Sequence, residues 1–274
     1  MNILNVASDL SEWRQFDLSR PYVIGMPQSP NHPRYWHSLP RRHGDMVRAD
    51  GGSAANDHIT MGTHVGTHID SLAHVSQDGR MYGGRDAGAA QVGGRFEELG
   101  IHTVRPYVGR GVLLDIPAIR GVEALDPGEE VTARDLANAE ELAAAPIGPN
   151  EAVLIRTGWG SRWSTGDRYI GRETGVPGPG VEAAEWLAER EPFLAGADTI
   201  AFERLQPGAG HAVLPVHRIL LVEHGIHIVE TLALETISAA GVRDFVLMLV
   251  PMPLVGATGS PVRPIALIPG TENG

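Results

Sequence analysis

The chain of 274 residues contains no cysteine, which excludes disulfides, thiolate metal sites, iron–sulfur clusters and a cysteine nucleophile. Basic residues are also few. The 22 Lys and Arg residues against 33 Asp and Glu residues give a formal net charge of −11, the wrong sign for a nucleic-acid binder or for an anionic membrane surface. No apolar run approaches the ~20 residues that cross a bilayer, and the N-terminus does not resemble a secretory signal. We therefore expect a cytoplasmic protein that binds neither nucleic acid nor membrane.

The composition is otherwise that of a globular protein, with 42% hydrophobic and 20% charged residues. The 34 Gly and 20 Pro residues are unusually many, and they predict a fold rich in loops and turns. The length permits one large domain, and no repeat or low-complexity linker marks a boundary within it.

Expected strands and helices alternate along the chain, which predicts a single-domain α/β fold. Thr132 is the expected N-cap of one helix, with Asp135 in its first turn. The expected strands cover residues 21–25, 58–61, 111–116, 152–156, 199–202, 226–230, 245–250 and 266–268, and the expected helical segments cover residues 132–145, 181–190 and 216–223.

Residues 1–50 differ from the rest and are expected to form an N-terminal arm, followed by the main domain at 51–270. Within the arm, residues 27–42 hold four prolines together with Tyr35 and Trp36, which predicts a long loop. Long loops of this kind often serve as functional lids, and an arm that contacts a second subunit is the equal alternative.

Four residues that bind metals or transfer protons lie within eleven positions: His64, His68, Asp70 and His74. Imidazole and carboxylate are the ligands that zinc and manganese accept where thiolates are absent. Gly66 lies between the first two histidines and would allow the backbone to approach an ion closely. One histidine is usually a structural residue, but this density favours a metal or catalytic site.

A second group of polar residues lies between positions 211 and 230. In an extended strand, Glu230 shares a face with Ile226 and Ile228, where a carboxylate is costly unless it is paired or bound to a metal. His227 lies on the opposite face, and a hydrogen-bonded structural histidine is the favoured interpretation for it.

The segment HVGTHIDSLAH at 64–74 resembles the H-x-G-T-H-x-D-x-x-x-H signature of the metal-dependent cyclase-like hydrolases, the family of bacterial kynurenine formamidases and isatin hydrolases. The resemblance extends over residues 50–270, including the S-P-x-R pattern at 260–263. It implies a swivelling β/β/α sandwich that assembles as a homodimer or homotetramer. It also implies a divalent metal centre of one or two ions, and mixed histidine and carboxylate ligands suit zinc and manganese alike. The implied metal ligands are His64, His68, Asp70, His217 and Glu230, and the implied general acid/base is His74.

This chain departs from the formamidase branch at Leu72, where proline is frequent in that branch, so the substrate stays open. The residues expected to contact a flat substrate ring are Trp36, Trp159 and Phe202, with His211 on a nearby Gly/Pro-rich loop. Packing in the core or between subunits is the alternative for each aromatic side chain.

The sequence therefore predicts a metal-dependent amidohydrolase that opens a cyclic amide, imide or lactone or cleaves an aryl formamide. A lyase or cyclase with the same metal site is the alternative among enzymes. A non-catalytic metal- or small-molecule-binding protein is disfavoured because His74 is present beside the ligands. A serine hydrolase is disfavoured because the chain has no G-x-S-x-G motif.

Overall fold

The computed structural model describes residues 12–270, and its centre is a mixed sheet of nine strands. The outer strands on one side are β1 and β17, and those on the other side are β4 and β16. In spatial order the strands are β1 (Arg14–Asp17), β17 (Ile265–Ile268), β15 (Asp244–Leu249), β9 (Tyr107–Asp115), β11 (Ala152–Arg156), β13 (Leu194–Ala197), β14 (His227–Glu230), β4 (His68–Asp70) and β16 (Gly259–Pro261).

The four central strands, β9, β11, β13 and β14, are parallel, whereas every other pairing in this sheet is antiparallel. Parallel strands are buried on both faces, which explains why the sequence of β11 is an uninterrupted apolar run up to Arg156. The alternation of strands and helices and the single α/β domain are confirmed.

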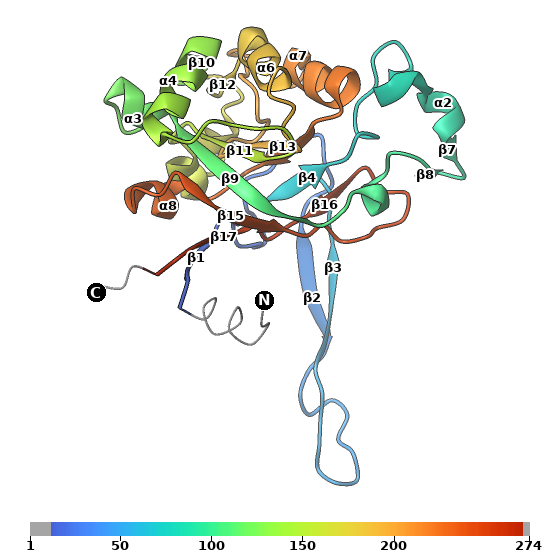
Figure 1. Cartoon of the computed structure of the whole chain (residues 1–274). Coiled ribbons are helices and arrows are strands. Elements are labelled where there is room, and N and C mark those ends of the chain that lie inside the picture. Colours follow the sequence, from blue (N-terminus) through green and yellow to red (C-terminus); the bar gives the residue numbers. More distant parts are fainter. Residues whose placement is uncertain (1–11, 271–274) are drawn as a thin grey trace, which may run out of the picture.

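Helices cover one face of the sheet (Figure 1). They are α3 (Ile116–Arg120), α4 (Ala133–Ala143), α6 (Val181–Ala188) and α7 (Pro215–His217), the last continuing into the π-helix η4 (Arg218–His224). The apolar side chains between these helices and the sheet form the larger core cluster, and those of the opposite face, with α8 (Glu235–Ala239), form a second cluster. No helix among residues 12–270 is long and apolar enough to cross a membrane.

The N-cap predicted at Thr132 is confirmed. The Thr132 hydroxyl accepts a hydrogen bond from the backbone of Asp135, whose carboxylate accepts one from the backbone of Thr132 at 2.8 Å. This reciprocal capping box satisfies two N–H groups that the first turn of a helix leaves free.

A hairpin of β2 (Trp36–Arg41) and β3 (Asn56–Thr60) extends away from the body of the molecule (Figure 1). The expected loop at 27–42 therefore ends in a strand. Residues 14–17 of the expected N-terminal arm form β1 at the edge of the large sheet. The predicted strand at 58–61 belongs to the hairpin, and 21–25 form no strand.

The predicted strand at 199–202 is wrong, because the strand of this region, β13, ends at Ala197. Phe202 has a φ of 55°, a left-handed conformation that an extended strand does not contain. The remaining elements are short: β5 (Arg80–Met81), η1 (Tyr82–Gly84), β6 (Arg85–Asp86), α2 (Ala87–Ala90), β7 (Gln91–Val92), β8 (Arg95–Phe96), η2 (Ile101–Thr103), β10 (Glu130–Val131), η3 (Trp159–Thr165), α5 (Asp167–Ile170) and β12 (Gly178–Pro179).

Candidate metal and active site

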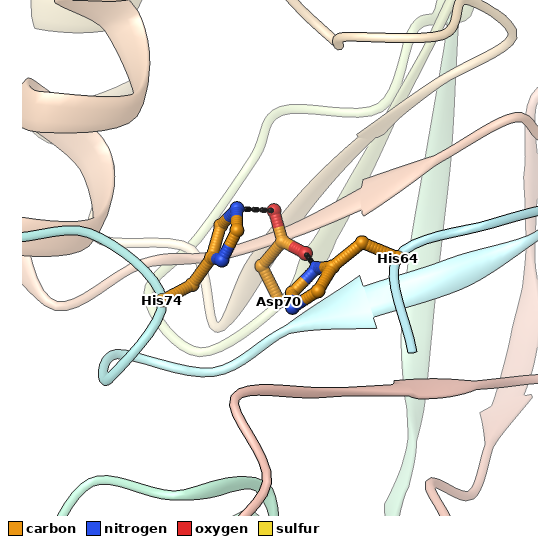
Figure 2. A group of neighbouring side chains, drawn as sticks. All are labelled: His64, Asp70 and His74. Atoms are coloured by element: carbon orange, nitrogen blue, oxygen red, sulfur yellow. Dashed lines mark hydrogen bonds and ion pairs between the residues drawn. The ribbon is translucent and has the colours of Figure 1, made fainter. Parts of the chain in front are cut away.

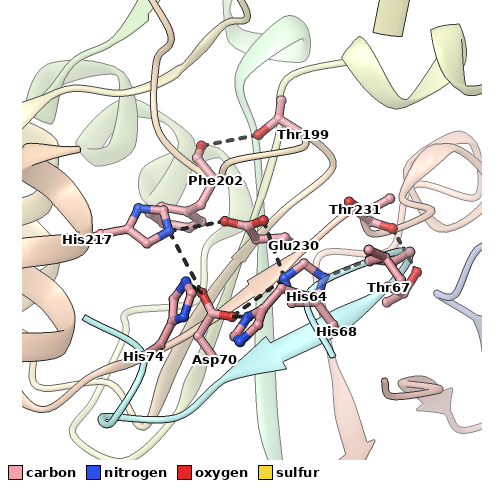
Figure 3. Close-up of polar contacts among 12 residues, drawn as sticks. His64, Thr67, His68, Asp70, His74, Thr199, Phe202, His217, Glu230 and Thr231 are labelled. Atoms are coloured by element: carbon pink, nitrogen blue, oxygen red, sulfur yellow. Dashed lines mark hydrogen bonds and ion pairs between the residues drawn. The ribbon is translucent and has the colours of Figure 1, made fainter. Parts of the chain in front are cut away.

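The register between β4 and β14 brings the two separate sequence clusters together. Glu230 lies directly opposite His68, and Ile228 lies opposite Asp70. Residues opposite each other in an antiparallel pair point to the same face, and residues two apart on one strand do too. The side chains of His68, Asp70 and Glu230 therefore converge on the helix-covered face, as Figure 3 shows.

A tight turn before β4 holds the first histidines in place. Gly66 has a φ of 64°, and a Cβ atom there would lie 2.6 Å from the ring of Tyr22. The Tyr22 hydroxyl lies 3.0 Å and 2.7 Å from the backbone oxygens of Val65 and Thr67. The sequence suggested that Gly66 lets the backbone approach an ion. In the structure, the group that packs closely against Gly66 is the ring of Tyr22.

His217 is oriented by a residue that the sequence analysis did not identify, Glu203. The Glu203 carboxylate is buried and accepts a hydrogen bond from Nδ1 of His217 at 2.7 Å. It also accepts the backbone N–H groups of Val216 and His217 at 3.1 Å and 2.8 Å. One sequence signal could have identified Glu203. It directly follows the apolar run 200–202, where an unpaired carboxylate is costly.

The Nε2 atoms of two histidines face the two carboxylates (Figure 3). Nε2 of His68 lies 3.5 Å from an oxygen of Asp70 and 3.5 Å from an oxygen of Glu230. Nε2 of His217 lies 3.2 Å from Glu230 and 3.8 Å from Asp70. All four side chains are buried.

The donor set fits a divalent cation. Nδ1 of His68 donates to the backbone oxygen of Gly66 at 2.8 Å, so in the neutral ring Nε2 presents a lone pair toward the carboxylates. The Oδ2 atom of Asp70 is buried and has no hydrogen-bond partner among the described residues. Lone pairs and an unpartnered carboxylate oxygen that face one another are the arrangement that a cation stabilises.

His64 and His74 also face the carboxylate of Asp70 (Figure 2). Nδ1 of His64 lies 2.6 Å from Oδ1 of Asp70, and its Nε2 lies 2.8 Å from the Thr258 hydroxyl. The His74 ring stacks on that of His64 with centroids 3.8 Å apart, and its Nε2 is 4.0 Å from Oδ2 of Asp70. The ligand atoms form two candidate groups, His64–Asp70–His74 and His68–Asp70–Glu230, which share Asp70.

The protonation equilibria follow from burial and from these contacts. Burial raises the pKa of Asp70, but the neighbouring His74, His64 and His68 outweigh it and hold that pKa well below its usual range. Burial lowers the pKa of His74 to about 3, so its imidazole is neutral near pH 7. Burial also acts to lower the pKa of His217, but its contacts with Glu203 and Glu230 raise it to about 10.

The four residues expected to contact substrate differ in their positions. Trp36 is 55% exposed on the hairpin and lines a cavity of about 400 Å³. Trp159 is completely buried and donates its indole N–H to the backbone oxygen of Tyr169, and Phe202 is completely buried in the larger core cluster. His211 lies on the loop before α7. Burial lowers the pKa of His211 below its ordinary value, and the nearby charge of Glu230 opposes this effect.

Two other histidines lie around the site. His32, in the long N-terminal loop, stacks its ring on His64 with centroids 5.4 Å apart. His227 lies on the opposite face of β14 from Glu230, and its Nδ1 donates to the backbone oxygen of Asp70 at 3.0 Å. This is the hydrogen-bonded structural role expected for His227.

Comparisons with known proteins agree with this site. A family model described as putative cyclase matches residues 16–204. The isatin hydrolase of Roseibium aggregatum is 28% identical over 224 residues, which cover 81% of this chain and 78% of that protein. The kynurenine formamidase of Bacillus cytotoxicus is 26% identical over 255 residues, which cover 93% and 97% of the two chains.

Solved structures show the same fold. A crystal structure of a protein called a novel cyclase is 29% identical, with a TM-score of 0.84 and coverage of 96% of this chain and 91% of that chain. Isatin hydrolase A from Ralstonia solanacearum is 23% identical, with a TM-score of 0.76 and coverage of 98% and 97%.

Proposed function

Because the chain belongs to the putative cyclase family, we propose that it is a metal-dependent hydrolase that cleaves a non-peptide C–N bond or a lactone in a small molecule. The candidate substrates are cyclic amides, imides, lactones and aryl formamides. The observation that carries the proposal is that the Nε2 atoms of His68 and His217 face the carboxylates of Asp70 and Glu230, while Oδ2 of Asp70 has no hydrogen-bond partner among the described residues. The relatives that support it are isatin hydrolase and kynurenine formamidase.

The residues proposed to hold the metal are His64, His68, Asp70, His217 and Glu230. Asp70 and Glu230 are the carboxylates proposed to bridge two ions if two bind, because each lies near Nε2 of both His68 and His217. Zinc and manganese both suit mixed imidazole and carboxylate ligands. A bound divalent ion would polarise the scissile carbonyl and make a water molecule more acidic.

His74 is the proposed general acid/base. Its side chain is 23% exposed, whereas that of His68 is 3% exposed, so His74 is the more accessible to substrate and water. Its neutral imidazole accepts a proton from the attacking water and returns it to the leaving nitrogen or oxygen. Asp70 is placed to stabilise the imidazolium that forms in between. General acid–base assistance of this kind contributes roughly 10²–10⁴-fold to rate.

We further propose that the protein is cytoplasmic and assembles as a homodimer or homotetramer. The exposed apolar side chains of the hairpin, Trp36, Leu39 and Ile59, support self-association, because such residues are costly in water. Light scattering coupled to size exclusion measures the assembly state directly.

The function is tested by elemental analysis of protein purified without chelator, together with hydrolysis assays on isatin, N-formylkynurenine and a cyclic imide. We expect stoichiometric zinc or manganese, turnover of one substrate, loss of turnover on chelation and recovery on readdition of the metal. Protein that binds no divalent ion and regains no hydrolysis with any added metal would rule the proposal out.

A further inference from the structure

A cavity of about 400 Å³ lies between the N-terminal loop, residues 24–36, and the segment 166–172 around α5. Met26, Pro27, Trp36 and Ile170 contribute apolar surface to its walls. His32 also lines it, and the ring of His32 stacks on that of His64. The ring of His32 therefore lies between a small molecule in this cavity and His64 of the candidate metal site.

Two arginines line the same cavity from different segments, Arg34 from the N-terminal loop and Arg172 from the residues after α5. Both are exposed, and neither forms an ion pair within residues 12–270. Arg172 also lines a neighbouring cavity of about 620 Å³, together with Arg162 and Arg168. Two carboxylates line these cavities: Asp167 borders both, and Glu173 borders the larger one.

This concentration of positive charge contrasts with the net charge of −11 of the chain. A guanidinium group presents several N–H donors in a plane and binds a carboxylate through two parallel hydrogen bonds. Apolar walls, two arginines and a candidate hydrolytic site next to His32 match a flat aromatic molecule that carries an acid group.

We propose that Arg34 and Arg172 bind a carboxylate substituent of the substrate, so that the enzyme prefers aromatic amides or lactones that carry an acid group away from the scissile bond. This inference rests on the proposed function for the identity of the reaction, but the anion site itself can be measured without turnover. A carboxylate is also released by hydrolysis, so the test must separate a substituent of the substrate from the acid group of the product.

The first experiment measures binding. Benzoate and its neutral isostere benzamide are titrated by calorimetry into the metal-loaded full-length protein, the Arg34→Gln and Arg172→Gln variants, and Arg134→Gln as the control. Arg134 is an exposed arginine on α4 that lines neither cavity. We expect each cavity variant to weaken benzoate binding roughly tenfold or more, without changing benzamide binding. If both cavity variants bind benzoate as Arg134→Gln does, its carboxylate binds elsewhere, for example at the metal, and the proposal fails.

The second experiment measures selectivity. The ratio of kcat/KM for 3-formamidobenzoate to that for formanilide is expected to fall roughly tenfold in Arg34→Gln and Arg172→Gln and to keep its wild-type value in Arg134→Gln. Arg172→Lys is expected to recover part of the preference, because it keeps the charge but loses the planar donor pair. Weaker benzoate binding with an unchanged substrate ratio would assign the arginines to the product acid and overturn the proposal. If the wild-type protein hydrolyses neither compound, aryl formamides of this kind are not its substrates, and the titration still decides whether the anion site exists.

Discussion

The hydrogen bond of 2.7 Å from Nδ1 of His217 to Glu203 determines which nitrogen of that ring faces Asp70 and Glu230. A carboxylate in this position also increases the basicity of the other nitrogen, which strengthens it as a metal ligand. The same carboxylate accepts two backbone N–H groups at the start of α7, so it fixes both the helix and the ring.

Replacing Glu203 with Gln is therefore expected to weaken metal binding by roughly 10–100-fold, with the fold retained. Gln keeps the shape and one acceptor oxygen but loses the charge that orients the imidazole. The measurement is competition for the metal with a chelator of known affinity, with circular dichroism to verify folding. Glu223→Gln is the control, because Glu223 is exposed on η4. Equal metal affinity in the two variants would contradict the role assigned to Glu203.

His74 and His68 are expected to respond differently to replacement by alanine. His74→Ala should retain the metal and lose roughly 10²–10⁴-fold in kcat, because it removes the proton carrier. His68→Ala should lose metal and activity together. The measurement pairs elemental analysis with steady-state kinetics, and His224→Ala on the exposed end of η4 serves as the control. Loss of metal from His74→Ala would make His74 a ligand instead.

Gly259 on β16 leaves room for the His64 ring. A Cβ atom at Gly259 would lie 2.5 Å from Cε1 of His64. Gly259→Ala is therefore expected to displace His64 from both Asp70 and Thr258, which lowers metal affinity and activity without unfolding the sheet. Chelator competition and kinetics measure the effect, with Gly148→Ala as the control because its nearest neighbour atom would be 3.6 Å away. An unchanged Gly259→Ala enzyme would show that the position of His64 is unimportant.

The capping box of α4 predicts a pH-dependent contribution to stability. Burial acts to raise the pKa of Asp135, but hydrogen bonds from Arg120 and Thr132 outweigh it and lower that pKa below the ordinary 3.8. A lowered pKa in the folded state stabilises the protein above the unfolded-state value, and this stabilisation is lost as the pH falls through the folded-state value.

Asp135→Asn should therefore lower Tm at pH 7, and the difference from wild type should shrink as the pH is lowered below about 4. Thermal unfolding of the two metal-free proteins across this pH range measures it, and Asp78→Asn, at an exposed position, is the control. A Tm difference that stays constant down to pH 2 would contradict this interpretation of Asp135.

Much of the fold could be predicted because its signals are local. The apolar runs of β9, β11 and β15 and the capped helix α4 are encoded within short segments. The strand expected at 199–202 is wrong because its β-forming residues lie in a turn between the end of β13 and the buried Glu203, with Phe202 in a left-handed conformation. Trp159 shows the same limit, since an aromatic residue that follows a strand can line a pocket or fill the core, and only packing decides between them.

By itself, the sequence determined the chemistry of the site. His64, His68, Asp70 and His74 are close in sequence, so any fold of this segment keeps them near one another. The tertiary structure decided the rest, because pairing β4 with β14 and placing α7 above them depend on contacts between residues more than a hundred positions apart. The strand pairing places Glu230 opposite His68, and a contact over only fourteen positions brings Glu203 behind His217. The tertiary structure also brings Arg34 and Arg172 into one cavity, an arrangement that no local pattern in the sequence records.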